Sequence, residues 1–252
     1  MQKQIQKKLS EIEGKENIKI LHAVESGSRA WGFASPDSDY DVRFIYVRPK
    51  NYYLQLEKSR DVVEYPIDAV LDINGWDLNK TLRLLHSSNP TLFEWCNSPI
   101  IYQTTDFFEE LKLIINEYFQ AKSGLYHYLS MAEGNYREYL KGEFVRAKKY
   151  FYVIRPILAC KWILENNCPP PMLFSELMKN QLDDSMKSVV NELLTLKMNT
   201  PEIGEIRKID VLNQYIEDNL AAIKDQIEVM PKEKEPEWDK LNKLFLLALN
   251  EL

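Results

Sequence analysis

The feature that most constrains the fold is a change in sequence pattern near residue 105. Before it, short segments are rich in β-branched and aromatic residues or alternate apolar with polar positions, which is typical of strands. After it, this alternation fades and apolar residues recur at helical spacing through 106–119, 123–140, 143–164 and several segments from 175 onward. The pattern predicts an α+β fold: a small mixed β-sheet with flanking helices, followed by an all-α C-terminal domain.

We expect the domain boundary after residue 103, which gives domains 1–103 and 104–252. In the first domain we predict helices and strands in alternation. The helices span 3–13 and 77–85, the strands span 18–24, 40–47, 61–65 and 67–73, and a turn lies at Asn74-Gly75. Asp77 has the right side chain and position to cap the second helix.

Composition limits the classes of partner. No apolar run approaches the roughly 18 residues that span a bilayer, and the charged N-terminus does not resemble a signal peptide. We therefore expect a soluble cytoplasmic protein without a membrane partner. The net charge of −6 is unfavourable for clamping long duplex DNA, which usually needs a basic surface. The three cysteines and three histidines are not spaced as a zinc site, so carboxylates should hold any metal.

The residues best suited to chemistry lie between 27 and 43. Gly27 allows the backbone to approach a ligand closely, and Ser28 adds a hydroxyl beside exposed N–H groups, which favours phosphate binding. Asp39 and Asp41 are one residue apart on a predicted strand, so both carboxylates should point to one face. Paired carboxylates repel each other unless a cation lies between them, and oxygen ligands suit Mg²⁺ or Mn²⁺. Phosphate binding beside a divalent cation is typical of nucleotidyl transfer.

A family resemblance covers this region. Gly-Ser, ten intervening residues and Asp-X-Asp resemble the signature of DNA polymerase β-like nucleotidyltransferases. The segments GSRAWGFASPDSDYDVRFIYV and LDINGWDLNKTLRLLHSSNPTLFEW resemble a bacterial and phage branch, the RNA repair pathway DNA polymerase β family. The resemblance is strong over about 20–102 and looser to about 165. It implies a metal-dependent enzyme that binds an NTP.

The resemblance also implies a third carboxylate on a neighbouring strand. Asp72 is our choice, as a metal ligand or as the base that accepts the proton of the attacking hydroxyl. Asp68 lies on the same predicted strand at an even offset, so it shares the face and stays an alternative.

Candidate nucleotide contacts come from two parts of the chain. Arg29 follows the Gly-Ser pair and would either contact phosphate or pair with an acid. In two-domain members of the superfamily, a helix of the second domain closes the nucleotide cleft. Lys148, Tyr152 and Arg155 share one face of a predicted helix, with Lys149 beside them, and either bind the triphosphate or form a solvated surface.

The leading hypothesis is transfer of a nucleoside monophosphate from an NTP to an acceptor hydroxyl. An RNA end, a small molecule or a protein side chain would all serve as acceptor, and the family resemblance favours RNA repair. A protein-modifying adenylyltransferase, of the kind that acts as the antidote in a toxin–antitoxin pair, is one alternative. A non-catalytic nucleotide sensor is another, although such a protein would be expected to have lost a carboxylate, and Asp39 and Asp41 are both present.

Overall fold

The computed structural model describes residues 1–57, 59–65, 70–199 and 204–250. These residues form two compact units. Unit 1 comprises 1–30, 39–118 and the end of the chain from 235, and unit 2 comprises 31–38 and 119–234. A single boundary after residue 103 does not describe this division, because the chain passes between the units four times.

Unit 1 contains a sheet and the helices around it. Its helices are α1 (Gln2–Glu16), α2 (Gly27–Ala30), α3 (Lys50–Tyr53), α4 (Leu78–His86), α5 (Pro90–Cys96), α6 (Asp106–Ile114), the 3-10 helix η1 (Ile115–Tyr118) and α12 (Asp239–Asn250). Its strands are β1 (Lys19–Glu25), β2 (Tyr40–Val47), β3 (Val62–Glu64), β4 (Leu71–Asp77) and β5 (Ile101–Thr104). This arrangement confirms the predicted α+β class.

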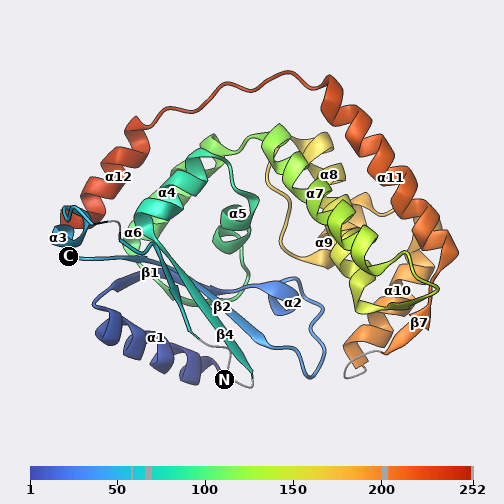
Figure 1. Cartoon of the computed structure of the whole chain (residues 1–252), viewed down its shortest axis with the longest axis horizontal. Helices are drawn as coiled ribbons and strands as arrows, with labels where there is room; N and C mark the ends of the chain where they lie inside the picture. Colours follow the sequence, from blue (N-terminus) through green and yellow to red (C-terminus); the bar gives the residue numbers. More distant parts are fainter. Residues whose placement is uncertain (58, 66–69, 200–203, 251–252) are drawn as a thin grey trace. The chain divides into compact units, whose positions relative to one another are not determined.

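The five strands form one mixed sheet in the order β3-β4-β2-β1-β5. β2 pairs parallel with β4, whereas the other neighbours are antiparallel. α1 and α4 lie on opposite sides of the sheet (Figure 1). Val42, Phe44 and Tyr46 are buried in one cluster with Ile5 and the rest of the apolar stripe of α1. Side chains alternate along a strand, so Asp41 and Arg43 emerge on the face away from α1.

The predicted turn at Asn74-Gly75 is wrong, because both residues lie inside β4. The glycine serves a different purpose: a Cβ atom on Gly75 would lie 2.2 Å from the ring of Phe44. The ring packs against the bare backbone, which is a recognised reason for glycine within a strand. The predicted helix cap is correct, since the Asp77 carboxylate accepts a hydrogen bond of 2.8 Å from Asn79 N–H. Because β4 runs from Leu71 to Asp77, Asp72 lies near the start of the strand and not at its end.

Unit 2 is mostly helical. Its helices are α7 (Ala121–Tyr139), α8 (Lys148–Asn166), α9 (Phe174–Gln181), α10 (Asp184–Asn199) and α11 (Asp210–Val229). A two-stranded antiparallel sheet of β6 (Phe144–Arg146) and β7 (Glu205–Arg207) also occurs, so the predicted all-α domain needs this correction. Three-residue strands are too short to leave an alternating pattern that sequence can reveal. None of the helices in the described ranges combines the length and apolar character required to cross a membrane.

Candidate active site

The site in unit 1 begins where β1 ends. The chain turns at Ser26 and enters α2 at Gly27, whose φ of 59° lies in the left-handed region that favours glycine. A Cβ atom at this position would lie 2.1 Å from Oδ2 of Asp41. Glycine is therefore required here for its backbone conformation and for the close approach of the Asp41 carboxylate. The Gly-Ser turn and the second acid of Asp-X-Asp, both identified from sequence, are thus direct neighbours.

Asp41 and Asp72 face each other across the parallel strands β2 and β4, where they are register partners. Both side chains are partly accessible, at 29% and 30%. The structure thus brings Asp72 beside Asp41, as the family resemblance implies. Asp68, the alternative, lies outside the described residues.

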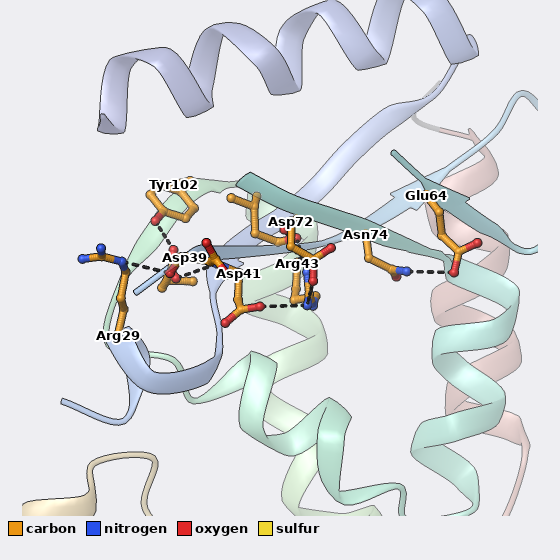
Figure 2. A network of polar contacts seen from close by, with 10 residues as sticks. Arg29, Asp39, Asp41, Arg43, Glu64, Asp72, Asn74 and Tyr102 are labelled. Carbon is orange, nitrogen blue, oxygen red and sulfur yellow. Dashed lines mark hydrogen bonds and ion pairs between the residues drawn. The ribbon is translucent and has the colours of Figure 1, made fainter. Parts of the chain in front are cut away.

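Arg43 joins the two carboxylates, as Figure 2 shows. Its Nη2 donates to Oδ1 of Asp41 at 3.1 Å and to Oδ2 of Asp72 at 2.6 Å. Its Nη1 donates to the backbone carbonyls of Val42 at 3.1 Å and Asp72 at 2.9 Å. The guanidinium is therefore fixed to the backbone and holds one oxygen of each carboxylate.

The Asp41 carboxyl lies near charges of both signs, since Arg43 and Arg29 lower its pKa and Asp72 and Asp39 raise it. Burial raises the pKa of Asp41, the Arg43 guanidinium opposes that rise, and the negative charges of Asp72 and Asp39 add to it. A raised carboxylate pKa means that the ionised form is under-compensated in the folded protein. The donor chemistry and the excess negative charge fit a hard divalent cation. In the part of the chain that is described, no three His, Cys, Asp or Glu side chains are grouped as a ready-made metal site.

Asp39 occupies a different environment from Asp41. It precedes β2, which begins at Tyr40, and it is exposed. Arg29 binds this segment: its Nε donates to the Asp39 carbonyl at 3.0 Å, and its guanidinium lies 3.7 Å from the centroid of the Tyr40 ring. Arg29 therefore helps to fix the backbone that leads from the Gly-Ser turn into β2.

The loop between Ser28 and Asp39 is built into unit 2. Phe33 is 1% exposed within the core of that unit. The Phe33 carbonyl accepts a hydrogen bond of 2.9 Å from Lys197 Nζ, and the Trp31 carbonyl accepts one of 2.9 Å from Phe174 N–H. The two halves of the motif are thus joined by a segment that the helical unit holds.

The candidate nucleotide-binding residues on α8 differ in how deeply they are buried. Arg155 is 2% exposed, with its guanidinium 4.6 Å from the Trp31 ring and Nη2 near the Met172 carbonyl at 3.4 Å. It packs inside unit 2, and this burial favours neither the expected phosphate contact nor the alternative of a solvated surface. Lys148, Lys149 and Tyr152 are half-buried. The Lys149 ammonium lies 3.6 Å from the centroid of the Tyr139 ring.

Two residues that sequence reasoning missed complete the site. Arg43 is two residues after Asp41 on the same strand face, a spacing that could have identified it. Glu25 is an acid at the end of a strand that is buried at every position except Lys19, and Glu25 itself is fully buried. An acid in such a strand is a recognisable signal, because an ionisable group is seldom buried without partners.

Known proteins resemble the chain along its whole length. It matches the RlaP family, described as the RNA repair pathway DNA polymerase beta family, over residues 1–247. The chain belongs to this family. It is also 44% identical to the uncharacterized protein YcgL of Bacillus subtilis (strain 168), over 100% of this chain and 98% of that protein. RlaP membership makes the chain a nucleotidyltransferase-like protein.

Among solved structures, a nucleotidyltransferase-like protein from Exiguobacterium sibiricum 255-15 is 11% identical to the chain. The match covers 98% of this chain and 80% of that one, with a TM-score of 0.33.

Proposed function

We propose that this protein transfers a nucleoside monophosphate from an NTP to an acceptor hydroxyl. The observation that carries the proposal is the placement of the Asp41 carboxylate against Gly27 and opposite Asp72. A turn suited to phosphate then adjoins a carboxylate pair suited to a divalent cation. In the reaction, the acceptor oxygen forms a bond to the α-phosphorus, the bond from that phosphorus to the bridging oxygen breaks, and pyrophosphate leaves.

Asp39, Asp41 and Asp72 would hold Mg²⁺ or Mn²⁺. When bound, such an ion neutralises charge on the triphosphate and lowers the pKa of the attacking hydroxyl. Gly27 and Ser28 would bind phosphate oxygens at the start of α2. Arg43 keeps the carboxylates of Asp41 and Asp72 in one orientation. Asp72 would also accept the proton that the hydroxyl loses.

The acceptor we favour is an RNA end, in line with the description of the family. The acidic net charge of −6 agrees with binding one end in preference to a long duplex. Incubation with each α-labelled NTP, Mg²⁺ or Mn²⁺, RNA and cell extract tests this directly. Label in RNA supports the proposal, whereas label confined to protein, located by mass spectrometry, supports a protein-modifying adenylyltransferase. NTP binding without transfer under all these conditions supports a nucleotide sensor.

Asp72 is expected to matter for turnover more than for NTP binding. Asp72→Ala removes one of the two carboxylates that share Arg43 and leaves Asp41 and Asp39 to hold the metal–triphosphate. Turnover should fall by about 100-fold or more, the range of a positioned acid–base group, while NTP affinity changes less. Asp68→Ala is the matched comparison, since Asp68 is the competing assignment. Full activity of Asp72→Ala together with an inactive Asp68→Ala would reverse the assignment.

Triphosphate contacts from Lys148, Lys149 and Tyr152 on α8 stay a prediction. Lys148→Ala should weaken NTP binding about tenfold, which is the low end of a charge-assisted hydrogen bond. Lys161→Ala is a suitable control on the same helix, because Lys161 is paired with Asp183 at 2.7 Å. Equal NTP affinity in calorimetric titrations of the parent and Lys148→Ala would assign this helix face to solvent.

A further inference from the structure

Glu25 marks the point at which β1 leaves the sheet. Along β1 and β2 the backbones pair from Lys19 opposite Val47 to Glu25 opposite Val42. Beyond Glu25 the chain turns toward α2, although Ser26 N–H still donates to the Asp41 carbonyl at 2.8 Å. The Asp41 N–H points to the same edge, because the N–H and C=O of one residue in an antiparallel ladder share a side.

The Glu25 side chain supplies the acceptor at this point. Its Oε1 accepts a hydrogen bond of 2.8 Å from Asp41 N–H. A buried N–H group without an acceptor is unfavourable, and here the Glu25 carboxyl takes the place of the strand that has turned away. Glu25 therefore binds the backbone of Asp41, and the Asp41 side chain lies between Gly27 and Arg43.

Hydrogen bonds reach both the side chain and the backbone of Glu25. Its Oε2 accepts a short hydrogen bond from the Tyr102 hydroxyl on β5, and its carbonyl accepts one of 2.6 Å from Ser98 Oγ. Figure 2 shows the Tyr102 side chain directed into this network. The carboxyl is wholly shielded from solvent. A carboxyl with fixed partners and no access to solvent can hold a neighbouring residue in place, but it cannot contact a substrate.

We infer that Glu25, held by Tyr102, is a positioning residue that sets the place of Asp41 in the active site. Its action rests on the proposed function, because Asp41 is the group it aligns. Burial raises the pKa of Glu25, and its bonds from Tyr102 and the Asp41 N–H oppose that rise, which is consistent with a carboxyl kept in place by its partners. The hydrogen bond to the Asp41 N–H is the feature on which the inference depends.

Two substitutions separate hydrogen bonding from volume and charge. Glu25→Gln keeps an oxygen that can accept from Asp41 N–H, whereas Glu25→Met keeps a similar volume without an acceptor. Ser98→Ala is the matched control, because it removes a bond to the carbonyl of the same residue and leaves the side chain untouched. Each protein is assayed for NTP-dependent pyrophosphate release with RNA as acceptor, and for hydrogen exchange at the Asp41 amide.

Glu25→Met should lower kcat about 100-fold with the KM for NTP within a few-fold, the effect of a small misplacement near the reacting atoms. Its Asp41 amide should exchange at least about tenfold faster than in the parent. Glu25→Gln should stay within about tenfold of the parent in kcat and keep the amide protected, and Ser98→Ala should match the parent. If Glu25→Met does not fold, Tyr102→Phe takes its place and should show a smaller fall in kcat and faster exchange.

Parent-like exchange at Asp41 in Glu25→Met, or in Tyr102→Phe where that variant replaces it, would overturn the inference. So would a Glu25→Gln protein that loses protection to the same degree as Glu25→Met. If the parent shows no pyrophosphate release, the proposed function fails, and the exchange measurements still decide the role of Glu25 separately.

Discussion

Asp41→Asn should lower nucleotidyl transfer by about 1000-fold or more without loss of the fold. The substitution removes a carboxylate that lies against Gly27 and shares Arg43 with Asp72. Losses of this order follow the removal of a preorganised group that stabilises charge in the transition state. Asn is close to Asp in shape, and burial already raises the pKa of Asp41, so a neutral side chain should not destabilise the folded protein at neutral pH.

Asp37→Asn is the matched control, since Asp37 is an exposed acid of the same motif segment. It should retain the activity of the parent. Turnover, circular dichroism and thermal unfolding of both variants make up the test. Full turnover by Asp41→Asn would remove this residue from the active site.

Gly27→Ala should reduce turnover by about 100-fold and also lower stability. The added Cβ atom would stand 2.1 Å from Oδ2 of Asp41, so the carboxylate or the turn must move. The φ of 59° adds a backbone cost of about 1 kcal/mol for any residue with a Cβ atom. A displacement near 1 Å close to reacting atoms is enough for a loss of that size.

Gly14→Ala provides the contrast within the same unit. Gly14 lies in α1, and a Cβ atom there would meet no other atom within 4 Å. Alanine in a helix interior stabilises by about 0.5–1 kcal/mol relative to glycine, so this variant should unfold at an equal or higher temperature and keep its activity. A Gly27→Ala protein with parent-like kcat would mean that the close approach to Asp41 has no role in catalysis.

Sequence patterns predicted most of unit 1 because the signals for its turn, strands and helix cap come from residues close together in the chain. The Gly27-Ser28 turn, the strand that carries Asp41 and the cap at Asp77 each depend on residues close in the chain. The pairing of Asp72 with Asp41 came from family resemblance, and the parallel register of β2 and β4 provides its structural basis.

Longer-range features could not be predicted. Gly75 lies in β4 because the Phe44 ring on β2 packs where a side chain would be. The Asn-Gly pair gives no local sign of that contact. The return of α12 to unit 1 and the burial of Phe33 in unit 2 depend on tertiary packing alone. The expected boundary after residue 103 would also separate α6 from unit 1, although Phe107 and Phe108 of α6 are buried there. Both predictions for Arg155, a triphosphate contact and a solvated surface, require an accessible side chain. Helical spacing shows which residues share a face but not whether that face is buried.

The reaction proposed at the carboxylates beside the Gly27 turn transfers a nucleoside monophosphate and not a terminal phosphate. The most direct measurement compares the same NTP labelled at the α- or the γ-phosphate, incubated with the protein, Mg²⁺ or Mn²⁺, and RNA. We predict that α-label enters the acceptor and γ-label leaves as pyrophosphate, and that Asp41→Asn lowers both by about 1000-fold or more. Transfer of the γ-label to the acceptor, or equal transfer by Asp41→Asn, would exclude nucleotidyl transfer by this carboxylate site.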